Sequence, residues 1–236
     1  MTAQSPTLDH ELPLVEHLRE FRNRLIVALL SLVVTTAIAF PFAESALQIL
    51  ISPLDQKPQA VNPTDTITVY FQVALVGGVA LAMPIILYQI VAFLLPALTN
   101  RERRYLLFFL PFATLLFVGG VAFAALVALP VSVAWLQDFG TGFAENQYIL
   151  TYYVEFVTTM LLGLGIGFET PMVIYLLAKL GIVTYPFLVK NTRWAFLITA
   201  IMAAVLTPTP DPLTMLVVLI PLFLLYLLGV LLARFA

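Results

Sequence analysis

The chain has 236 residues, of which 61% are hydrophobic and 10% are charged, and its mean hydropathy is +1.02. A soluble globular domain carries about 25% charged residues, so this composition excludes a water-soluble fold. The sequence contains no cysteine, which excludes disulfides and thiolate metal sites, and its two histidines, His10 and His17, both lie near the N-terminus. We therefore expect no metal site.

Apolar runs of membrane-spanning length recur along the chain. They lie at about 25–42, 69–95, 105–129, 156–180, 194–206 and 213–232. The fifth run has about 13 residues, ~20 Å as a helix, which is short of the ~30 Å hydrocarbon core. We expect the last two runs to form a hairpin whose tip lies below the membrane surface or thins the bilayer locally. The sequence predicts an all-α integral membrane protein, a single transmembrane domain over residues 1–236 with six spans.

Basic residues fall on one side of the membrane when the N-terminus is placed inside. The inner segments then hold ten of the eleven Lys and Arg residues: Arg19, Arg22, Arg24, Arg101, Arg103, Arg104, Lys179, Lys190, Arg193 and Arg234. Lys57 is the one basic residue outside. The positive-inside rule requires this asymmetry, so we expect both termini in the cytoplasm, with the protein in the inner (plasma) membrane or a thylakoid membrane.

Residues 12–25, ahead of the first span, are predicted to form an amphipathic lead-in helix. Leu14, Leu18 and Phe21 recur at helical spacing on one face. Glu20 and Arg24 lie on another face at the i,i+4 spacing that favours an ion pair. One interpretation is a surface helix with Glu20 paired to Arg24. The other is a carboxylate offered to a cationic ligand.

The loop between the second and third spans carries Glu102 among three arginines. Topology explains the arginines but not the glutamate. Glu102 either neutralises them locally or joins Glu20 in binding guanidinium groups through charge-assisted, bidentate hydrogen bonds.

Glu169 lies near the middle of the fourth span, in the run Gly165 to Pro171. An ionised carboxylate there costs at least ~2.5–3.5 kcal/mol, and an intramembrane acid is a functional residue by default. Pro171 removes the hydrogen bond to the Gly167 carbonyl and loosens the helix. The structural alternative is that Glu169 caps the loosened helix.

The turn between the fifth and sixth spans reads Thr-Pro-Thr-Pro-Asp-Pro, from Thr207 to Pro212. Asp211 is predicted either to N-cap the sixth helix, with Pro212 at its first position, or to serve a binding role. Thr207, Thr209 and Thr214 are candidates for hydrogen bonds to a neighbouring helix.

Further features predict irregular helices and close packing. Prolines within or at the ends of spans imply kinks: Pro84, Pro96, Pro111, Pro130, Pro171 and Pro221. Two glycine pairs, at 77–78 and 119–120, suggest close helix approach. The aromatic residues of the second outer loop, including Tyr148 and Tyr153, form either an interfacial belt or a cap.

Several motifs together resemble the TatC family in order and spacing, from about Leu14 to Phe235. They are Glu16 to Leu25 (EHLREFRNRL), Met83 to Leu98 (MPIILYQIVAFLLPAL), Glu102-Arg103-Arg104, Phe168-Glu-Thr-Pro171, and Thr207-Pro with Asp211. TatC proteins are the signal-peptide receptors of the twin-arginine protein translocase. The resemblance implies six kinked helices in a concave, glove-like bundle, with both termini cytoplasmic.

The resemblance also implies site residues. Glu20 and Glu102 match the acidic positions that read the twin-arginine pair of a signal peptide, and Arg22 and Phe93 match neighbouring motif positions. Residues matching other family positions are the first-loop proline Pro53, the intramembrane acid Glu169 with Pro171, and Asp211 with Thr207. The family's glutamine four residues after the turn acid is Met215 here.

The function implied is export of folded proteins with single-span TatA- and TatB-type partners, driven by the proton-motive force. We expect a homo-oligomer within that complex, with no catalytic chemistry, no cofactor and no nucleic-acid partner. One alternative is a proton-coupled small-solute transporter using Glu169, although no internal repeat supports it. Another is a ligand-free membrane scaffold.

Overall fold

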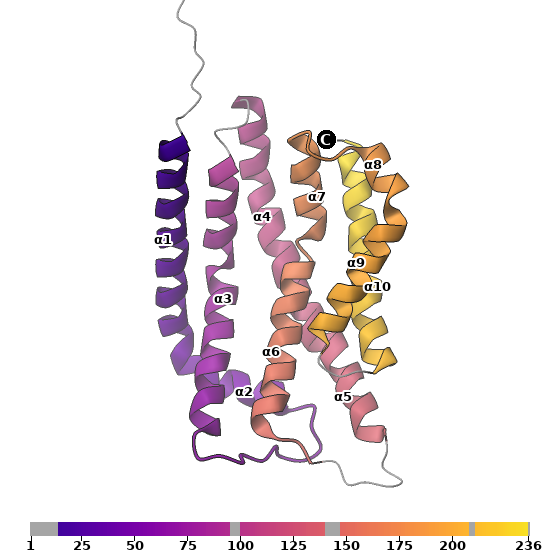
Figure 1. The fold of residues 1–236 in the computed structure, drawn as a ribbon. Helices are drawn as coiled ribbons and strands as arrows, with labels where there is room; N and C mark the ends of the chain where they lie inside the picture. The colour runs from indigo at the N-terminus through magenta and orange to yellow at the C-terminus, as the bar shows by residue number, and fades with distance from the viewer. Residues whose placement is uncertain (1–13, 95–99, 140–146, 208–210, 236) are drawn as a thin grey trace, which may run out of the picture.

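The computed structural model describes residues 14–94, 100–139, 147–207 and 211–235, with the side chains of 14, 15, 94 and 100–109 outside that description. The described chain is almost entirely helical (Figure 1). Its helices are α1 (Leu14–Ala39), η1 (Phe40–Phe42), α2 (Ala43–Ile51), α3 (Asp65–Leu94), α4 (Asn100–Phe123), η3 (Ala124–Ala128), α5 (Leu129–Asp138), α6 (Leu150–Gly167), α7 (Thr170–Lys179), α8 (Tyr185–Lys190), α9 (Thr192–Leu206) and α10 (Pro212–Ala233).

Five helical stretches of the described chain are long and apolar enough to cross a membrane. They are Glu16–Ile51, Asp65–Phe93, Leu110–Asp138, Leu150–Lys179 and Pro212–Ala233. The shorter apolar helix α9 has 15 residues, about 22 Å, whereas the 22 residues of its neighbour α10 extend about 33 Å. Five of the predicted spans therefore correspond to stretches long enough to cross, and the short fifth run forms the helix α9, whose crossing stays a prediction.

The two ends of the bundle differ in charge. The start of α1, the end of α3, the end of α7, α8 and the end of α10 share the upper end in Figure 1. We call this the basic end, after Arg22, Arg24, Lys190, Arg193 and Arg234. α2 and the end of α5 lie at the opposite, acidic end. Its charged residues include Glu44, Asp55, Asp65 and Asp138, with Lys57.

α1 and α3 lie side by side at one edge of the bundle, and the predicted lead-in segment and first span are one continuous helix from Leu14. Gly78 allows the close crossing, because a Cβ there would lie 2.6 Å from the Thr36 Cα. Thr35 Oγ1 also donates to the Gly78 carbonyl at 2.8 Å. Helix association in lipid depends on such packing and hydrogen bonds, since lipid is as apolar as the side chains.

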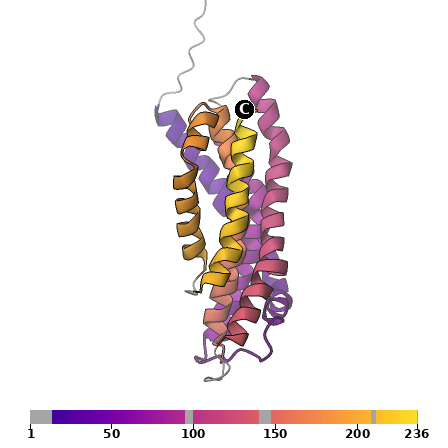
Figure 2. The same cartoon turned by 90° about the vertical axis from the view of Figure 1, so that its right-hand side faces the viewer.

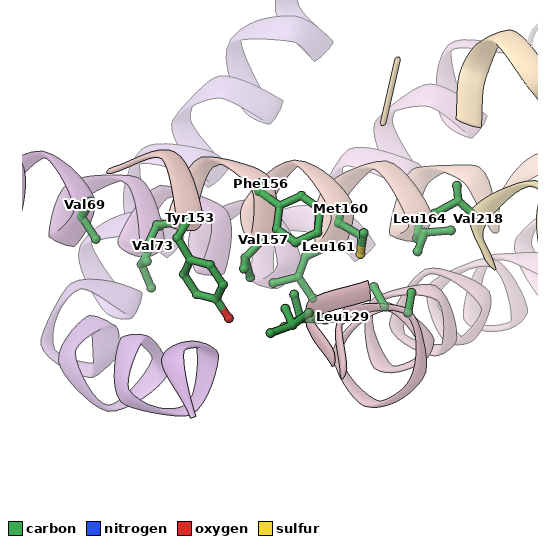
Figure 3. Packing of buried hydrophobic residues seen from close by; sticks show 14 of the residues in the cluster. Val69, Val73, Leu129, Tyr153, Phe156, Val157, Met160, Leu161, Leu164 and Val218 are labelled. Carbon is green, nitrogen blue, oxygen red and sulfur yellow. The ribbon is translucent and has the colours of Figure 1, made fainter. Parts of the chain in front are cut away.

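The central helix α6 forms the middle of the core. Its Phe156, Met160 and Leu164 lie in one buried cluster with Leu129 of α5 and Val218 of α10 (Figure 3). On its α3 side, Gln72 Nε2 donates to Thr158 Oγ1 at 2.8 Å. At the other edge, α10 packs against both α7 and α9 (Figure 2).

The second predicted glycine pair also lies at a close helix crossing, through one of its two members. A Cβ on Gly120 would lie 2.7 Å from the Leu164 carbonyl oxygen, where α4 crosses α6. Its neighbour Gly119 faces open space, with nothing within 4 Å. The sequence pattern therefore located the crossing but could not identify which glycine of the pair forms the contact.

The prolines act in two ways. Pro84, Pro111 and Pro221 lie inside helices that continue through them. Pro130 follows the π-helical segment η3, and Pro171 begins a new helix after a break at Phe168 and Glu169. A proline clashes with the carbonyl four residues earlier, and a widened or interrupted turn relieves that clash. Pro96 lies outside the described residues.

A cap of irregular chain closes the acidic end. Tyr153 Oη donates to the Leu50 carbonyl of α2 at 2.8 Å. An isolated parallel bridge pairs Gln59 with Ile149, through Gln59 N to the Tyr148 carbonyl at 2.7 Å and Leu150 N to the Gln59 carbonyl at 2.9 Å. Because Tyr153 is buried in this arrangement, it belongs to a cap, whereas Phe139 and Tyr152 are exposed and still fit the predicted belt.

Candidate functional site

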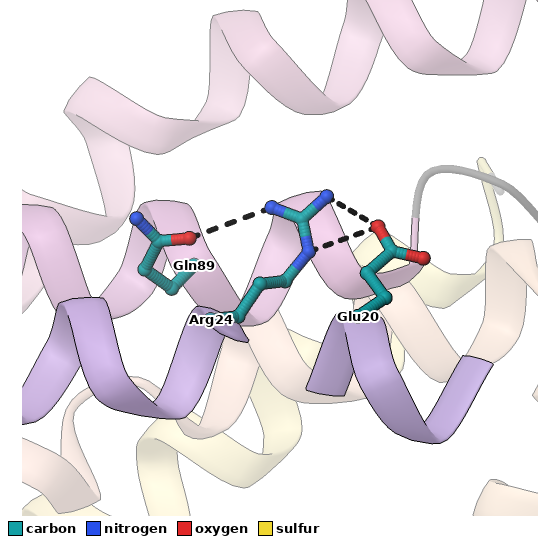
Figure 4. Close-up of polar contacts among 3 residues, drawn as sticks. All are labelled: Glu20, Arg24 and Gln89. Carbon is teal, nitrogen blue, oxygen red and sulfur yellow. Dashed lines mark hydrogen bonds and ion pairs between the residues drawn. The ribbon is translucent and has the colours of Figure 1, made fainter. Parts of the chain in front are cut away.

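The predicted carboxylate Glu20 lies at the basic end, on the face of α1 that meets α3. Arg24 donates to its Oε1 through both Nε, at 3.0 Å, and Nη2, at 2.5 Å (Figure 4). The third guanidinium nitrogen, Nη1, donates to Gln89 Oε1 of α3 at 3.4 Å. The predicted i,i+4 pair therefore forms, and it is extended across the helix interface by an amide.

Two adjacent hollows open beside this pair. The polar one, of about 540 Å³, is lined by residues that include Glu16, Arg19, Glu20, Asn23 and Gln89. The other, of about 350 Å³ and almost wholly apolar, is lined by residues that include Phe21, Leu25, Ile86, Ile90 and Phe93. Arg24 and Gln89 border both. We call the two together the α1–α3 groove.

Phe93 borders the apolar part of the groove at the end of α3. Its ring stacks on His17 of α1, with centroids 4.4 Å apart and planes 25° apart. Phe21 meets the same ring edge-on at 5.5 Å. Such aromatic contacts stabilise a pair beyond its buried area, so Phe93 joins the first turns of α1 to α3 and shapes the groove.

The structure says less about the other two predicted residues of this end, Arg22 and Glu102. Arg22 is exposed on α1, and its Nη2 donates to Asn23 Oδ1 at 3.3 Å. Glu102 falls in the first turn of α4, but its side chain lies outside the described residues. The predicted proximity of Glu102 to Glu20 therefore stays a prediction.

Glu169 is buried, with 5% of its surface exposed, at the break between α6 and α7. Neither carboxyl oxygen has a hydrogen-bond partner among the described residues, and the side chain does not cap α7. Thr170 Oγ1 instead donates to the Gly167 carbonyl at 2.6 Å, the group that Pro171 leaves without an amide donor. The capping alternative for Glu169 is therefore wrong.

The turn acid Asp211 is the N-cap of α10, with its Oδ1 accepting from Thr214 N at 2.7 Å. This confirms the capping prediction for Asp211, with Pro212 in the first turn. Thr207 is buried and donates to the Ala203 carbonyl of its own helix, at 2.8 Å, and not to a neighbouring helix as predicted. Thr209 lies outside the described residues. Met215, at the family's glutamine position, packs against the apolar core.

Pro53 is half-buried just after α2, where the chain turns into the cap.

Gln89 was not singled out from the sequence, although the structure places it at the centre of the groove. An amide within a largely apolar span was a usable signal, since such a group forms hydrogen bonds inside the bundle, as Gln72 of the same helix also does. No group of three or more Asp, Glu or His residues in the described chain could hold a metal ion.

A bundle of apolar helices with an intramembrane carboxyl and a charged groove at one end is a polytopic α-helical membrane protein. The family model for the Sec-independent protein translocase protein TatC matches residues 16–221. The chain therefore belongs to the TatC family. The match also confirms the predicted all-α membrane fold class and does not support a small-solute transporter.

Curated relatives and a solved structure agree with the family. A TatC protein from Carboxydothermus hydrogenoformans is 35% identical over 230 residues, covering 96% of this chain and 95% of the relative. A TatC protein from Deinococcus radiodurans is 37% identical, covering 94% and 86%. A crystal structure of the twin-arginine translocase receptor TatC superposes with a TM-score of 0.82 at 31% identity, covering 93% of this chain and 98% of that one.

Proposed function

We propose that this chain is the receptor subunit of a twin-arginine translocase and that the α1–α3 groove binds the signal peptide. The observation that carries the proposal is the Glu20 carboxylate in a polar hollow that shares Arg24 and Gln89 with an apolar hollow. A guanidinium needs a carboxylate partner, and the apolar residues beside it need a dry surface. The similarity of the chain to a solved twin-arginine translocase receptor supports the same function.

The receptor would face the cytoplasm at its basic end. This orientation follows from the positive-inside rule, and it puts both termini inside with six spans if α9 and α10 cross as a hairpin. The location is the inner (plasma) membrane. Glu102 would supply the second carboxylate for the arginine pair, Phe93 would border the apolar contact, and Arg22 would contact the approaching chain.

Partner subunits would meet the chain within the membrane. Glu169 is the strongest candidate contact, since its carboxyl is buried without a hydrogen-bond partner among the described residues. Asp211 has one oxygen, Oδ2, left without a hydrogen bond there, and Pro171 and Thr207 hold the local backbone around these two acids. The proposed partners are TatA- and TatB-type single-span subunits around a homo-oligomer of this chain, with the proton-motive force driving export and no catalytic step.

Site-directed crosslinking of an Arg-Arg signal peptide tests the receptor function. In a Glu20→Ala, Glu102→Ala variant we expect crosslinking to fall about tenfold or more, because hydrogen bonds to charged groups contribute ~1.5–3 kcal/mol. A Glu44→Ala, Glu155→Ala variant is the matched control, since both side chains are exposed away from the basic end. Undiminished crosslinking in the first variant, correctly inserted, would contradict the proposal.

A further inference from the structure

The Glu20 carboxylate is half occupied by the protein's own arginine. Both donors from Arg24 fall on the same oxygen, Oε1, while Oε2 accepts no hydrogen bond from the described residues. An arginine with free access to a carboxylate prefers the fork geometry, one donor to each oxygen. The Arg24 guanidinium does not adopt that geometry here, and its Nη1 donates to Gln89 on α3 instead.

We propose that Arg24 is a built-in competitor for Glu20 and weakens the binding of guanidinium ligands in the groove. An incoming arginine can bond Oε2 alone while Arg24 holds Oε1. To bind both oxygens, the incoming arginine must displace Arg24 from Glu20. The displaced Arg24 still has the Gln89 amide oxygen as a hydrogen-bond acceptor. This inference rests on the proposed receptor function and names a residue, Arg24, that tunes it.

The exchange explains why an apolar hollow adjoins the polar hollow that holds the carboxylate. Replacing one guanidinium by another on Glu20 gains little free energy by itself. A ligand gains affinity when its neighbouring side chain fills the hollow lined by Phe21, Leu25 and Phe93. A lone arginine, or an arginine followed by polar residues, competes poorly with Arg24. The internal pair therefore rejects the arginine-rich segments that a cytoplasmic surface meets.

The expected gain in ligand affinity follows from how exposed the ion pair between Arg24 and Glu20 is. The Arg24 and Glu20 side chains are 26% and 25% exposed, which places the pair close to surface ion pairs. Such pairs correspond to a factor of about two to five in a competing equilibrium. Removing the competitor should strengthen an arginine ligand by that factor. A lysine ligand should gain less, because its ammonium is a point charge that cannot use two oxygens as a fork does.

The experiment measures binding of fluorescent Arg-Arg and Lys-Lys signal peptides to the full chain in nanodiscs. In Arg24→Gln we expect Arg-Arg affinity to rise about two- to fivefold, with a higher ratio of Arg-Arg to Lys-Lys affinity. Arg19→Gln is the matched control: it removes an equal charge beside Glu20, with no ion pair to it. It should strengthen both peptides equally and leave the ratio unchanged. Arg24→Lys keeps the charge but has no guanidinium to donate twice to Oε1, and it should also raise the ratio.

Three outcomes are decisive. Equal shifts of both peptides in Arg24→Gln, as in the Arg19→Gln control, would overturn the competitor role and leave only a charge effect. Weaker Arg-Arg binding in both Arg24 variants would overturn it in favour of Arg24 orienting the carboxylate. Unchanged Arg-Arg binding in Glu20→Gln would instead overturn the proposed function, because the carboxylate itself would then have no part in recognition.

Discussion

Burial of the Glu169 carboxyl group does not stabilise the fold. A buried polar group without a partner costs about 1–3 kcal/mol, and both oxygens of Glu169 are in that position among the described residues. We therefore expect Glu169→Leu to leave the melting temperature of the purified protein unchanged or raised. We also expect it to abolish export of a folded twin-arginine reporter in cells.

Glu155→Leu is the control for this prediction, since it removes an exposed carboxyl from the same span. Glu155→Leu should change neither the melting temperature nor the export of the reporter. A lower melting temperature in Glu169→Leu would mean that the carboxyl supports the fold. Normal export in that variant would favour the scaffold interpretation of the chain.

Individual residues were predictable where their partners are close in sequence. The pair Glu20 and Arg24, four positions apart, and the cap of α10 by Asp211 follow from helix geometry alone. Gln89 was missed because its partner Arg24 lies 65 positions away. Thr170 was missed because only Glu169 was considered from the sequence as a cap for the loosened helix. The Thr170 hydroxyl bonds the freed carbonyl instead.

At the scale of helices, the crossing of α1 and α3 depends on the absence of a side chain at Gly78. A methyl group there would lie 2.6 Å from the Thr36 Cα and 2.8 Å from its amide nitrogen. Backbone cannot yield as a flexible side chain can, so we expect Gly78→Ala to lower the free energy of unfolding by about 1–3 kcal/mol. Thermal unfolding in detergent measures the loss.

Gly119→Ala is the matched substitution, because a Cβ at this helical position meets nothing within 4 Å. It should leave stability unchanged or slightly raised, since alanine favours a helix over glycine. Equal destabilisation by both substitutions would show that the loss comes from backbone flexibility and not from the crossing.

Elements were predictable to the extent that they are apolar and long. Each predicted span corresponds to a helix, but the predicted third and fourth spans are composite. The third continues through a π-helical segment into α5, and the fourth breaks at Glu169. A proline in the sequence indicates that the helix is disturbed there. Whether the helix bends, widens or breaks depends on which backbone carbonyls find other hydrogen-bond donors.

At the scale of the whole molecule, the orientation is open to a direct test, because the chain has no cysteine of its own. Single cysteines in place of Lys190 and Glu44, both exposed, mark the basic and acidic ends. A membrane-impermeant maleimide should label Lys190→Cys only from the cytoplasmic side and Glu44→Cys only from the outer side.

The hairpin of α9 and α10 needs its own marker. Pro212→Cys, at the exposed start of α10, should be labelled from the outer side if both helices cross. Labelling of this position from the cytoplasmic side would remove two spans while leaving the other assignments intact. Charge placement could not decide this point, since the loops on either side of the hairpin keep their sides in both cases.

The cap at the acidic end has a consequence for biosynthesis. Gln59 pairs with Tyr148 and Leu150, and Leu50 accepts from Tyr153, so each contact joins segments about ninety or more positions apart. At a synthesis rate of about 5–20 residues per second, α2 leaves the ribosome roughly 5–20 s before α6. The acidic end of the nascent protein stays open for that interval, and insertion of α6 is the event that seals it.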